Sequence, residues 1–318
     1  MSDILIHEVG PRDGLQIEKS VVPTDTKIAW IERLMASRVD VIQLGSFVSS
    51  ERMPQMADTE RLFMHFNARS RKPGQTELSA LVLNEKGLDR GFASGVDYFC
   101  MGVSASDTHS RKNTGMTTEE ALKRIVAMAD RALAAGAKVQ VSVQSAFGCG
   151  YEGVIPQERV LHIIKRYLEA GLTTISLADT AGHAQPSHVE DLFGTIRDLA
   201  PYVICACHFH DTYGMAMANC YAAYRSGVQS FESASAGLGG CPFTAVTGGN
   251  VATEDLVHMF QQMGLRTDIN LDALIGAAKD AEQFLGRALP GRILATGPVP
   301  DAALSGKTVP AMAAMVSS

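Results

Sequence analysis

The 318-residue sequence lacks several features that mark whole classes of protein. It has no apolar run of the roughly 18 residues that a membrane span needs. Its first residues, Met1, Ser2 and Asp3, carry neither the basic start nor the apolar stretch of a signal peptide. Its formal charge is −6, whereas non-specific nucleic-acid binding needs a basic surface. We therefore expect a cytoplasmic protein that binds a small molecule and neither membranes nor nucleic acids.

Two further patterns are missing. The six cysteines have no regular spacing, and disulfides are improbable in a cytosolic chain of this size. We therefore expect most of the thiols to be small core residues. No dinucleotide or P-loop glycine pattern follows an early strand, which argues against those nucleotide-binding folds.

Eight short apolar runs alternate with segments of helical spacing. This alternation predicts a parallel sheet, and eight strands are the number that a closed (β/α)8 TIM barrel requires. One helix start is marked by Thr117 and Glu120, and Gly136 marks its end. The expected strands lie near residues 4–9, 39–44, 77–82, 96–102, 138–143, 172–178, 203–208 and 229–234.

An open doubly wound sheet has the same alternation, so the distribution of polar residues decides between the two folds. An open sheet concentrates function at one switch point, whereas here polar residues follow most of the strands. They are Arg12, Asp13, Gln43, Ser46, Ser104, Ser106, Ser145, Asp179, His208, His210 and Ser235. We predict a barrel over residues 1–287, including a C-terminal helix near 270–286, and a flexible tail over 288–318.

The sharpest candidate site is the pair His208 and His210. Alternate residues of a strand share a face, so both imidazoles point one way and can bind one metal ion with an oxygen ligand such as Asp13. The alternative is that the histidines are core residues donating to carbonyl groups. A zinc site that adds Cys205 and Cys207 is disfavoured, because one extended strand cannot turn both pairs toward a single ion.

A glycine-rich stretch at 237–250 is predicted to be a loop over the barrel mouth. It contains Cys241, the thiol least expected in the core, although a structural loop cysteine is the alternative. Asn250 offers a carbonyl oxygen as a metal ligand, or it caps the helix that follows.

Several segments, in order along the chain, resemble the 3-hydroxy-3-methylglutaryl-CoA lyase family of metal-dependent barrels. They are EVGPRDGLQ, SFVSSERMPQMAD, SASDTHSRKN, HFHDTYG and AGLGGCPFTAVTGGNVATEDLV, and the likeness covers roughly residues 3 to 290. The resemblance implies Mg²⁺ or Mn²⁺ bound by Asp13, His208, His210 and Asn250. It also implies that Arg12 and Cys241 are catalytic and that Asp179 and Glu254 support the site.

The implied reaction cleaves 3-hydroxy-3-methylglutaryl-CoA into acetyl-CoA and acetoacetate. Arg12 is permanently cationic and suits the thioester oxygen, where enolate charge develops. Cys241 would protonate the enolate carbon. His208 is the base that the family implies, but a metal-bound imidazole has little freedom to take a proton, so a water molecule is the alternative.

Coenzyme A recognition is less clearly marked. Arg111 and Lys112 follow the fourth strand and could meet its phosphates, although a solvated charge cluster fits equally well. Two features depart from the family pattern: Gln43 stands where these lyases usually have glutamate, and the glycine-rich loop reads PFTAVTGGN rather than the usual tyrosine-containing form. These departures leave a related substrate such as citramalyl-CoA as the main alternative, and make Gln43 a candidate selectivity residue.

Two other classes remain as alternatives. A condensing synthase shares the barrel and metal, but such enzymes resemble LRDGEQ rather than GPRDGLQ and carry long C-terminal domains. A non-catalytic binding protein is supported only by Gln43. Barrels of this kind often form homodimers, and we expect one here.

Overall fold

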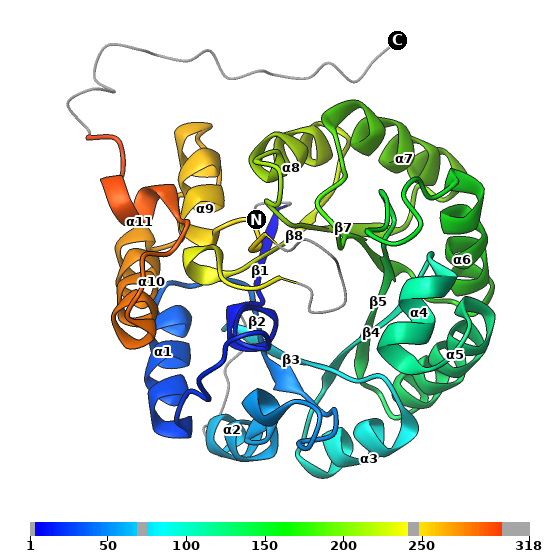
Figure 1. The fold of residues 1–318 in the computed structure, drawn as a ribbon, viewed down its shortest axis with the longest axis horizontal. Helices are drawn as coiled ribbons and strands as arrows, with labels where there is room; N and C mark the ends of the chain where they lie inside the picture. Colours follow the sequence, from blue (N-terminus) through cyan, green and yellow to red (C-terminus); the bar gives the residue numbers. More distant parts are fainter. Residues whose placement is uncertain (1–3, 69–74, 241–247, 301–318) are drawn as a thin grey trace.

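The computed structural model describes residues 4–68, 75–240 and 248–300. Its centre is a closed barrel of eight parallel strands that pair in sequence order, with β1 also paired to β8 (Figure 1). The TIM-barrel prediction is therefore confirmed. The strands are β1 (Leu5–Glu8), β2 (Val41–Ser46), β3 (Glu77–Leu81), β4 (Tyr98–Ser104), β5 (Lys138–Gln144), β6 (Thr174–Asp179), β7 (Ile204–Phe209) and β8 (Ser230–Ser233).

Helices surround the barrel (Figure 1). In chain order they are α1 (Thr24–Ala36), α2 (Thr59–Asn67), α3 (Glu85–Ala93), α4 (Asp107–Thr114), α5 (Thr118–Ala134), α6 (Gln157–Glu169), α7 (Pro186–Leu199), α8 (Ala216–Arg225), α9 (Thr253–Gln262), α10 (Leu271–Leu285) and α11 (Arg292–Thr296). Three short helical turns, η1 (Gly10–Gly14), η2 (Pro54–Met56) and η3 (Ser235–Gly237), lie in the loops.

The helix boundaries follow local chemistry. Thr117 and Glu120 form a reciprocal capping box that satisfies the first free N–H groups of α5. Gly136 follows the same helix with φ of 79°, a left-handed conformation that glycine adopts without steric cost. Asn270 caps α10, and Gly286 ends it in the left-handed region.

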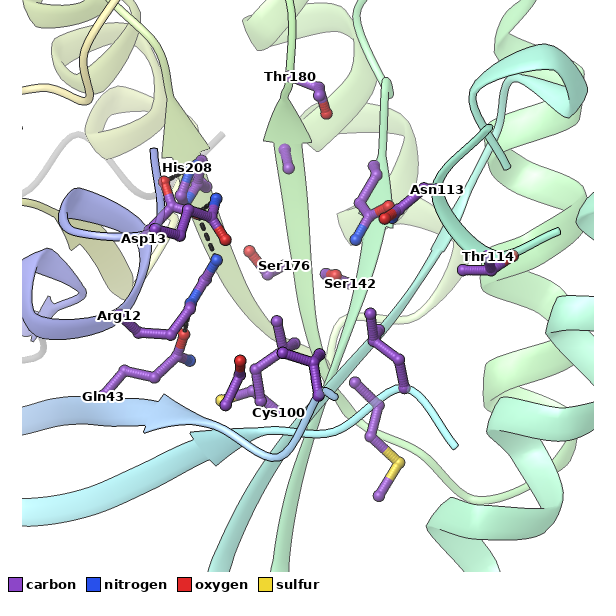
Figure 2. Close-up of a pocket in the computed structure, with 18 of the residues that line it drawn as sticks. Arg12, Asp13, Gln43, Cys100, Asn113, Thr114, Ser142, Ser176, Thr180 and His208 are labelled. Carbon is purple, nitrogen blue, oxygen red and sulfur yellow. Dashed lines mark hydrogen bonds and ion pairs between the residues drawn. The ribbon is translucent and has the colours of Figure 1, made fainter. Parts of the chain in front are cut away.

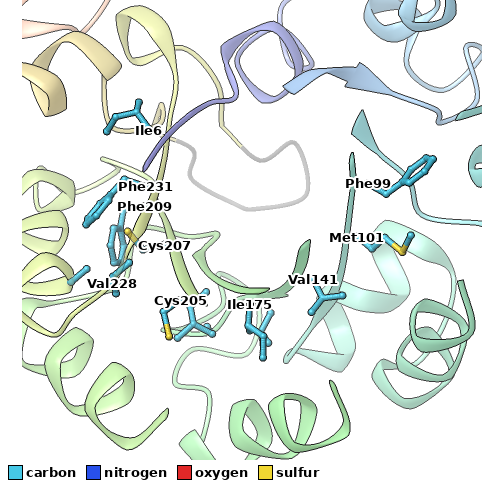
Figure 3. Close-up of a cluster of buried hydrophobic side chains, with 14 of the residues drawn as sticks. Ile6, Phe99, Met101, Val141, Ile175, Cys205, Cys207, Phe209, Val228 and Phe231 are labelled. Carbon is cyan, nitrogen blue, oxygen red and sulfur yellow. The ribbon is translucent and has the colours of Figure 1, made fainter. Parts of the chain in front are cut away.

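The apolar core fills the space between barrel and helices. Along β7, Cys205, Cys207 and Phe209 are buried in this core (Figure 3), whereas His208 lines the cavity inside the barrel. The two cysteines therefore lie on the opposite face of the strand from the histidine. A shared zinc site with Cys205 and Cys207 is excluded, and all five cysteines among the described residues are free.

The C-terminal helices complete the fold. Helix α10 packs against α1 and η3, and α11 packs against α9. Leu289 and Leu294 are buried in a second apolar cluster with Trp30. The tail expected to begin at residue 288 therefore contains a helix, α11. Residues 301–318 lie outside the described part of the chain, so the boundary between barrel domain and tail remains a prediction. None of the described helices is long and apolar enough to cross a membrane.

Candidate active site

The GPRDG segment forms η1, a single wide turn directly after β1. The carbonyl of Val9 accepts from the backbone N–H groups of both Arg12 and Asp13, at 3.0 and 2.7 Å. Gly10 is required by close approach, because a Cβ there would lie 2.4 Å from Glu8 Oε1. This turn places the adjacent arginine and carboxylate at the barrel mouth, where barrel enzymes hold their chemistry.

Asp13, His208 and His210 form a buried cluster whose potential ligand atoms all lie within 4.8 Å of one another. The two Nε2 atoms are 3.2 Å apart, and they lie 3.8 and 3.7 Å from Asp13 Oδ2. Each Nδ1 faces an acceptor: His208 Nδ1 lies 2.8 Å from Glu232 Oε2, and His210 Nδ1 lies 3.0 Å from the Thr180 carbonyl.

These contacts decide what the cluster can bind. A carbonyl only accepts hydrogen bonds, and so does an ionised carboxylate, so each Nδ1 must carry a proton. In neutral histidine the two Nε2 atoms then present bare lone pairs toward each other and toward the Asp13 carboxylate. Three electron donors that converge in a buried space fit a divalent cation.

Asn250 joins the same cluster. Its Nδ2 donates to Asp13 Oδ2 at 2.8 Å and to the Leu238 carbonyl at 2.9 Å. Its Oδ1 is buried without a hydrogen-bond partner among the described residues, so a fourth ligand atom is free for an ion. The alternative role as a helix cap is wrong, because α9 has Ala252 at its N-cap and no side-chain cap bond.

Arg12 is held from two sides. Its Nε donates to Gln43 Oε1, and its terminal nitrogen NH1 donates to Asp13 Oδ1. Burial opposes ionisation of Asp13, but the Arg12 guanidinium, together with the two imidazoles when they are protonated, outweighs it and holds the pKa of this carboxyl well below its usual range. Asp13 is therefore an anion wherever the protein is folded, as a metal ligand must be.

A cavity of about 910 Å³ opens beside the cluster (Figure 2). Arg12, Asp13, His208 and His210 line it, and neutral polar side chains such as Ser142 and Ser176 form much of its wall. This volume suits a ligand of cofactor size.

Three further cations line the same cavity, namely Arg52, Lys112 and Arg124. Lys112 lies over the Tyr151 ring at 4.7 Å. Arg111, which the sequence grouped with Lys112, does not line the cavity and pairs instead with Asp107 at 2.8 Å.

Two expected site residues, Asp179 and Glu254, lie outside the cavity. Asp179 accepts from the backbone of His183 and Ala184, and burial raises its pKa. Glu254 accepts from the Ala236 N–H behind η3, and burial raises its pKa to about 8. Neither lines the cavity, so the structure places both as supports of loops. Cys241 lies outside the described residues.

Sequence reasoning missed Glu232. This carboxylate on β8 lines the cavity, contacts His208 and accepts from Gln140 Nε2 at 2.7 Å. Burial disfavours its charged form, but the hydrogen bond from His208 and the charge of that ring when it is protonated lower the pKa of Glu232 to about 2. The sequence did indicate this residue, because Glu232 lies within an expected buried strand and a buried carboxylate needs a partner.

Fold and site together define a (β/α)8 barrel with a buried carboxylate and imidazole cluster at the mouth. The HMGL-like family model matches residues 3–280, and the chain belongs to this family.

Similar proteins include a Bacillus subtilis hydroxymethylglutaryl-CoA lyase, 37% identical over 92% of this chain and 96% of its own length. The (R)-citramalyl-CoA lyase of Chloroflexus aurantiacus is 38% identical over 94% and 96%. Among solved structures, an Acinetobacter baumannii HMG-CoA lyase in complex with coenzyme A and 3-methylmalate has a TM-score of 0.88 and 35% identity. The aligned part covers 95% of this chain and 97% of the Acinetobacter baumannii chain.

Proposed function

We propose that this protein is a divalent-metal-dependent lyase that cleaves 3-hydroxy-3-methylglutaryl-CoA to acetyl-CoA and acetoacetate. The observation that carries the proposal is the position of Arg12 beside the cluster of Asp13, His208 and His210, all facing one cavity. The similarity to hydroxymethylglutaryl-CoA lyases over more than nine tenths of the chain supports the substrate.

Asp13, His208, His210 and Asn250 would hold the cation. Two imidazoles with carboxylate and amide oxygens suit Mn²⁺ or Mg²⁺ better than zinc, which favours thiolate-rich sites. When bound, such an ion acts as a Lewis acid that lowers the pKa of a coordinated hydroxyl group.

Arg12 supplies the positive charge where the reaction generates negative charge. The C2–C3 bond breaks as the substrate hydroxyl loses its proton, C3 becomes a ketone, and the bonding electrons pass to the acetyl-CoA enolate. A guanidinium has five N–H donors, and Gln43 and Asp13 take two of them. The remaining donors can reach the thioester oxygen in a site already fixed in place.

We propose that a water molecule, and not His208, accepts the proton of the substrate hydroxyl. His208 directs Nδ1 at Glu232 and Nε2 at Asp13 and His210. It therefore cannot both hold an ion through Nε2 and accept the hydroxyl proton, which favours a water molecule as the acceptor. We propose Cys241 as the acid that protonates the enolate carbon. This role rests on the family resemblance alone.

For coenzyme A we propose contacts with Lys112, which lines the cavity. Arg52 lines it as well and could meet the remaining phosphate charge. Arg124 also lines the cavity, but it pairs with Glu85 at 3.3 Å. Arg111 is a weaker candidate because Asp107 neutralises it.

Citramalyl-CoA is a second candidate substrate. The similarity to the (R)-citramalyl-CoA lyase is as high as that to the hydroxymethylglutaryl-CoA lyases, and cleavage of citramalyl-CoA yields acetyl-CoA and pyruvate. Gln43, which touches Arg12, is the residue that we propose to set this choice.

The test is a substrate panel. Purified protein with Mn²⁺ or Mg²⁺ is given several 3-hydroxyacyl-CoA thioesters, and release of acetyl-CoA is followed, with Arg12→Gln as the matched inactive control. The proposal expects the highest kcat/KM for 3-hydroxy-3-methylglutaryl-CoA. A preference for citramalyl-CoA would establish the second substrate, and no release from any thioester would reject a lyase.

A further inference from the structure

Glu232 lies in one row of the barrel between two histidines. Its strand β8 pairs with β1 on one side and β7 on the other, and the register places Glu232 opposite both His7 and His208. All three side chains are buried. A carboxylate between two imidazoles could serve either of them, so the contacts decide which one it holds.

The contacts assign Glu232 to His208. Its Oε2 lies 2.8 Å from His208 Nδ1. His7 instead contacts Ser79 Oγ through Nε2 at 2.9 Å, and burial lowers the pKa of His7 to about 4. His7 is therefore a neutral ring with a partner of its own.

A second residue fixes Glu232. Gln140 on β5 donates from Nε2 to Glu232 Oε1 at 2.7 Å, and its Oε1 accepts from the Tyr98 hydroxyl at 3.3 Å. The tyrosine contact sets which way the Gln140 amide points, since a phenol there donates to the oxygen. The chain of contacts thus runs from β4 through β5 and β8 to the imidazole on β7.

We propose that Glu232 is a positioning residue for the cation site: it fixes His208 with its proton on Nδ1 and aims Nε2 at Asp13 and His210. Gln140 holds Glu232 in place for this task. The inference rests on the metal site of the proposed function and adds to it a residue outside the motifs that indicated the family. A carboxylate behind a ligating histidine fixes both tautomer and ring orientation, and its loss typically weakens metal binding about 10–100-fold.

Two measurements without turnover test the proposal. In metal-free protein labelled with ¹⁵N-histidine, two-bond ¹H–¹⁵N spectra report the tautomer of His208, assigned by the loss of its signal in His208→Gln. Wild type should show Nδ1–H alone, and Glu232→Ala should show a mixture. Titration with Mn²⁺, followed by the electron paramagnetic resonance of free Mn²⁺, should give a Kd about 10–100-fold higher in Glu232→Ala.

Three further variants control for misfolding and for non-specific loss of metal binding. Glu232→Asp keeps a carboxylate and should recover part of the affinity, whereas Glu77→Gln removes a carboxylate that pairs with Lys138 and does not line the cavity. Glu77→Gln should bind Mn²⁺ as wild type does. If Glu232→Ala does not fold, Glu232→Gln keeps the shape of the side chain and should still weaken binding.

Wild-type affinity and a single Nδ1–H tautomer in Glu232→Ala would overturn the inference, as would an equal loss in Glu77→Gln. If wild type itself binds no Mn²⁺, the proposed metal-dependent function fails. The tautomer spectra then still decide whether Glu232 orients His208, so the two failures are distinguishable.

Discussion

Asn250 donates its side-chain amide to Asp13 Oδ2 at 2.8 Å, across 237 positions of sequence. This contact ties the segment after β8 to the turn after β1. The same Oδ2 faces both imidazoles, so one carboxylate oxygen organises the whole cluster.

Loss of a cluster ligand should remove the metal. Asp13→Ala and His210→Ala should each raise the Kd for Mn²⁺ by more than the roughly tenfold to hundredfold typical of outer partners, and should abolish most activity. Because both residues serve one ion, the double variant should lose little more than either single one. Metal stoichiometry after equilibrium dialysis checks this, and full Mn²⁺ occupancy in both single variants would remove the cluster from consideration.

Cys241→Ser should lower kcat by orders of magnitude, because a serine hydroxyl is a far poorer acid than a thiol near pKa 8.5. Mn²⁺ content should not change. Steady-state kinetics with parallel metal analysis measures both, and wild-type turnover would return Cys241 to a structural role.

Thiol reagents give an independent test, but Cys100 also lines the cavity. Burial raises the pKa of Cys100 to about 12, so it forms little thiolate at neutral pH. Cys100→Ser should therefore remain sensitive to the reagents, Cys241→Ser should resist them, and substrate should slow the inactivation. If Cys100→Ser resisted the reagents, the reactive thiol would be Cys100 and not Cys241.

Gln43→Glu should change substrate choice. The present amide accepts from Arg12 Nε without charge, whereas a glutamate would form an ion pair and compete with the substrate for Arg12. We expect the ratio of kcat/KM between 3-hydroxy-3-methylglutaryl-CoA and citramalyl-CoA to shift at least about tenfold, or roughly 1.4 kcal/mol, toward the glutaryl substrate. Both substrates are measured on both proteins, and an unchanged ratio would assign selectivity elsewhere.

Glu254 should make stability fall as pH rises. Burial raises its pKa from 4.5 to about 8, so between these values the folded state binds more protons than the unfolded state. Stability from this group is complete below about pH 4.5 and is lost as pH rises toward 8.

Glu254→Gln keeps an acceptor for the Ala236 N–H and removes the titration. The stability of this variant relative to wild type should rise by about 3.5 kcal/mol from pH 5 to pH 8, since one pKa unit is worth about 1.4 kcal/mol. Urea unfolding at both pH values measures the difference, and parallel pH curves for the two proteins would contradict it.

The sequence predicted the barrel because its signals are local. Each strand lies within a few residues of the expected run, and the Thr117 box and Gly136 mark a helix through contacts a few residues apart. The alternation of β7 likewise separated His208 from Cys207 correctly.

Contacts across the barrel could not be predicted in this way. The bond between Glu232 and His208 depends on which strands become neighbours and on their register. The same limit explains Asn250. Its position in the sequence suggests a helix cap, but its side-chain amide donates to Asp13, which follows β1 on the other side of the β1–β8 pairing. Side-chain type gave the chemistry of these residues, and only the three-dimensional arrangement gave their partners.

Closure of the barrel also bears on the order in which its strands pair during folding. Asp13 lies far before His208 and His210 in the sequence, and β1 finds its second neighbour only when β8 exists. Such distant pairings form late in folding. Closing a long loop costs conformational entropy before the strand contacts that offset this cost have formed. A ligand that binds only the completed ring stabilises it by mass action. An ion bound by Asp13, His208 and His210 would therefore also stabilise the closed barrel, because it would link the turn after β1 to the end of β7.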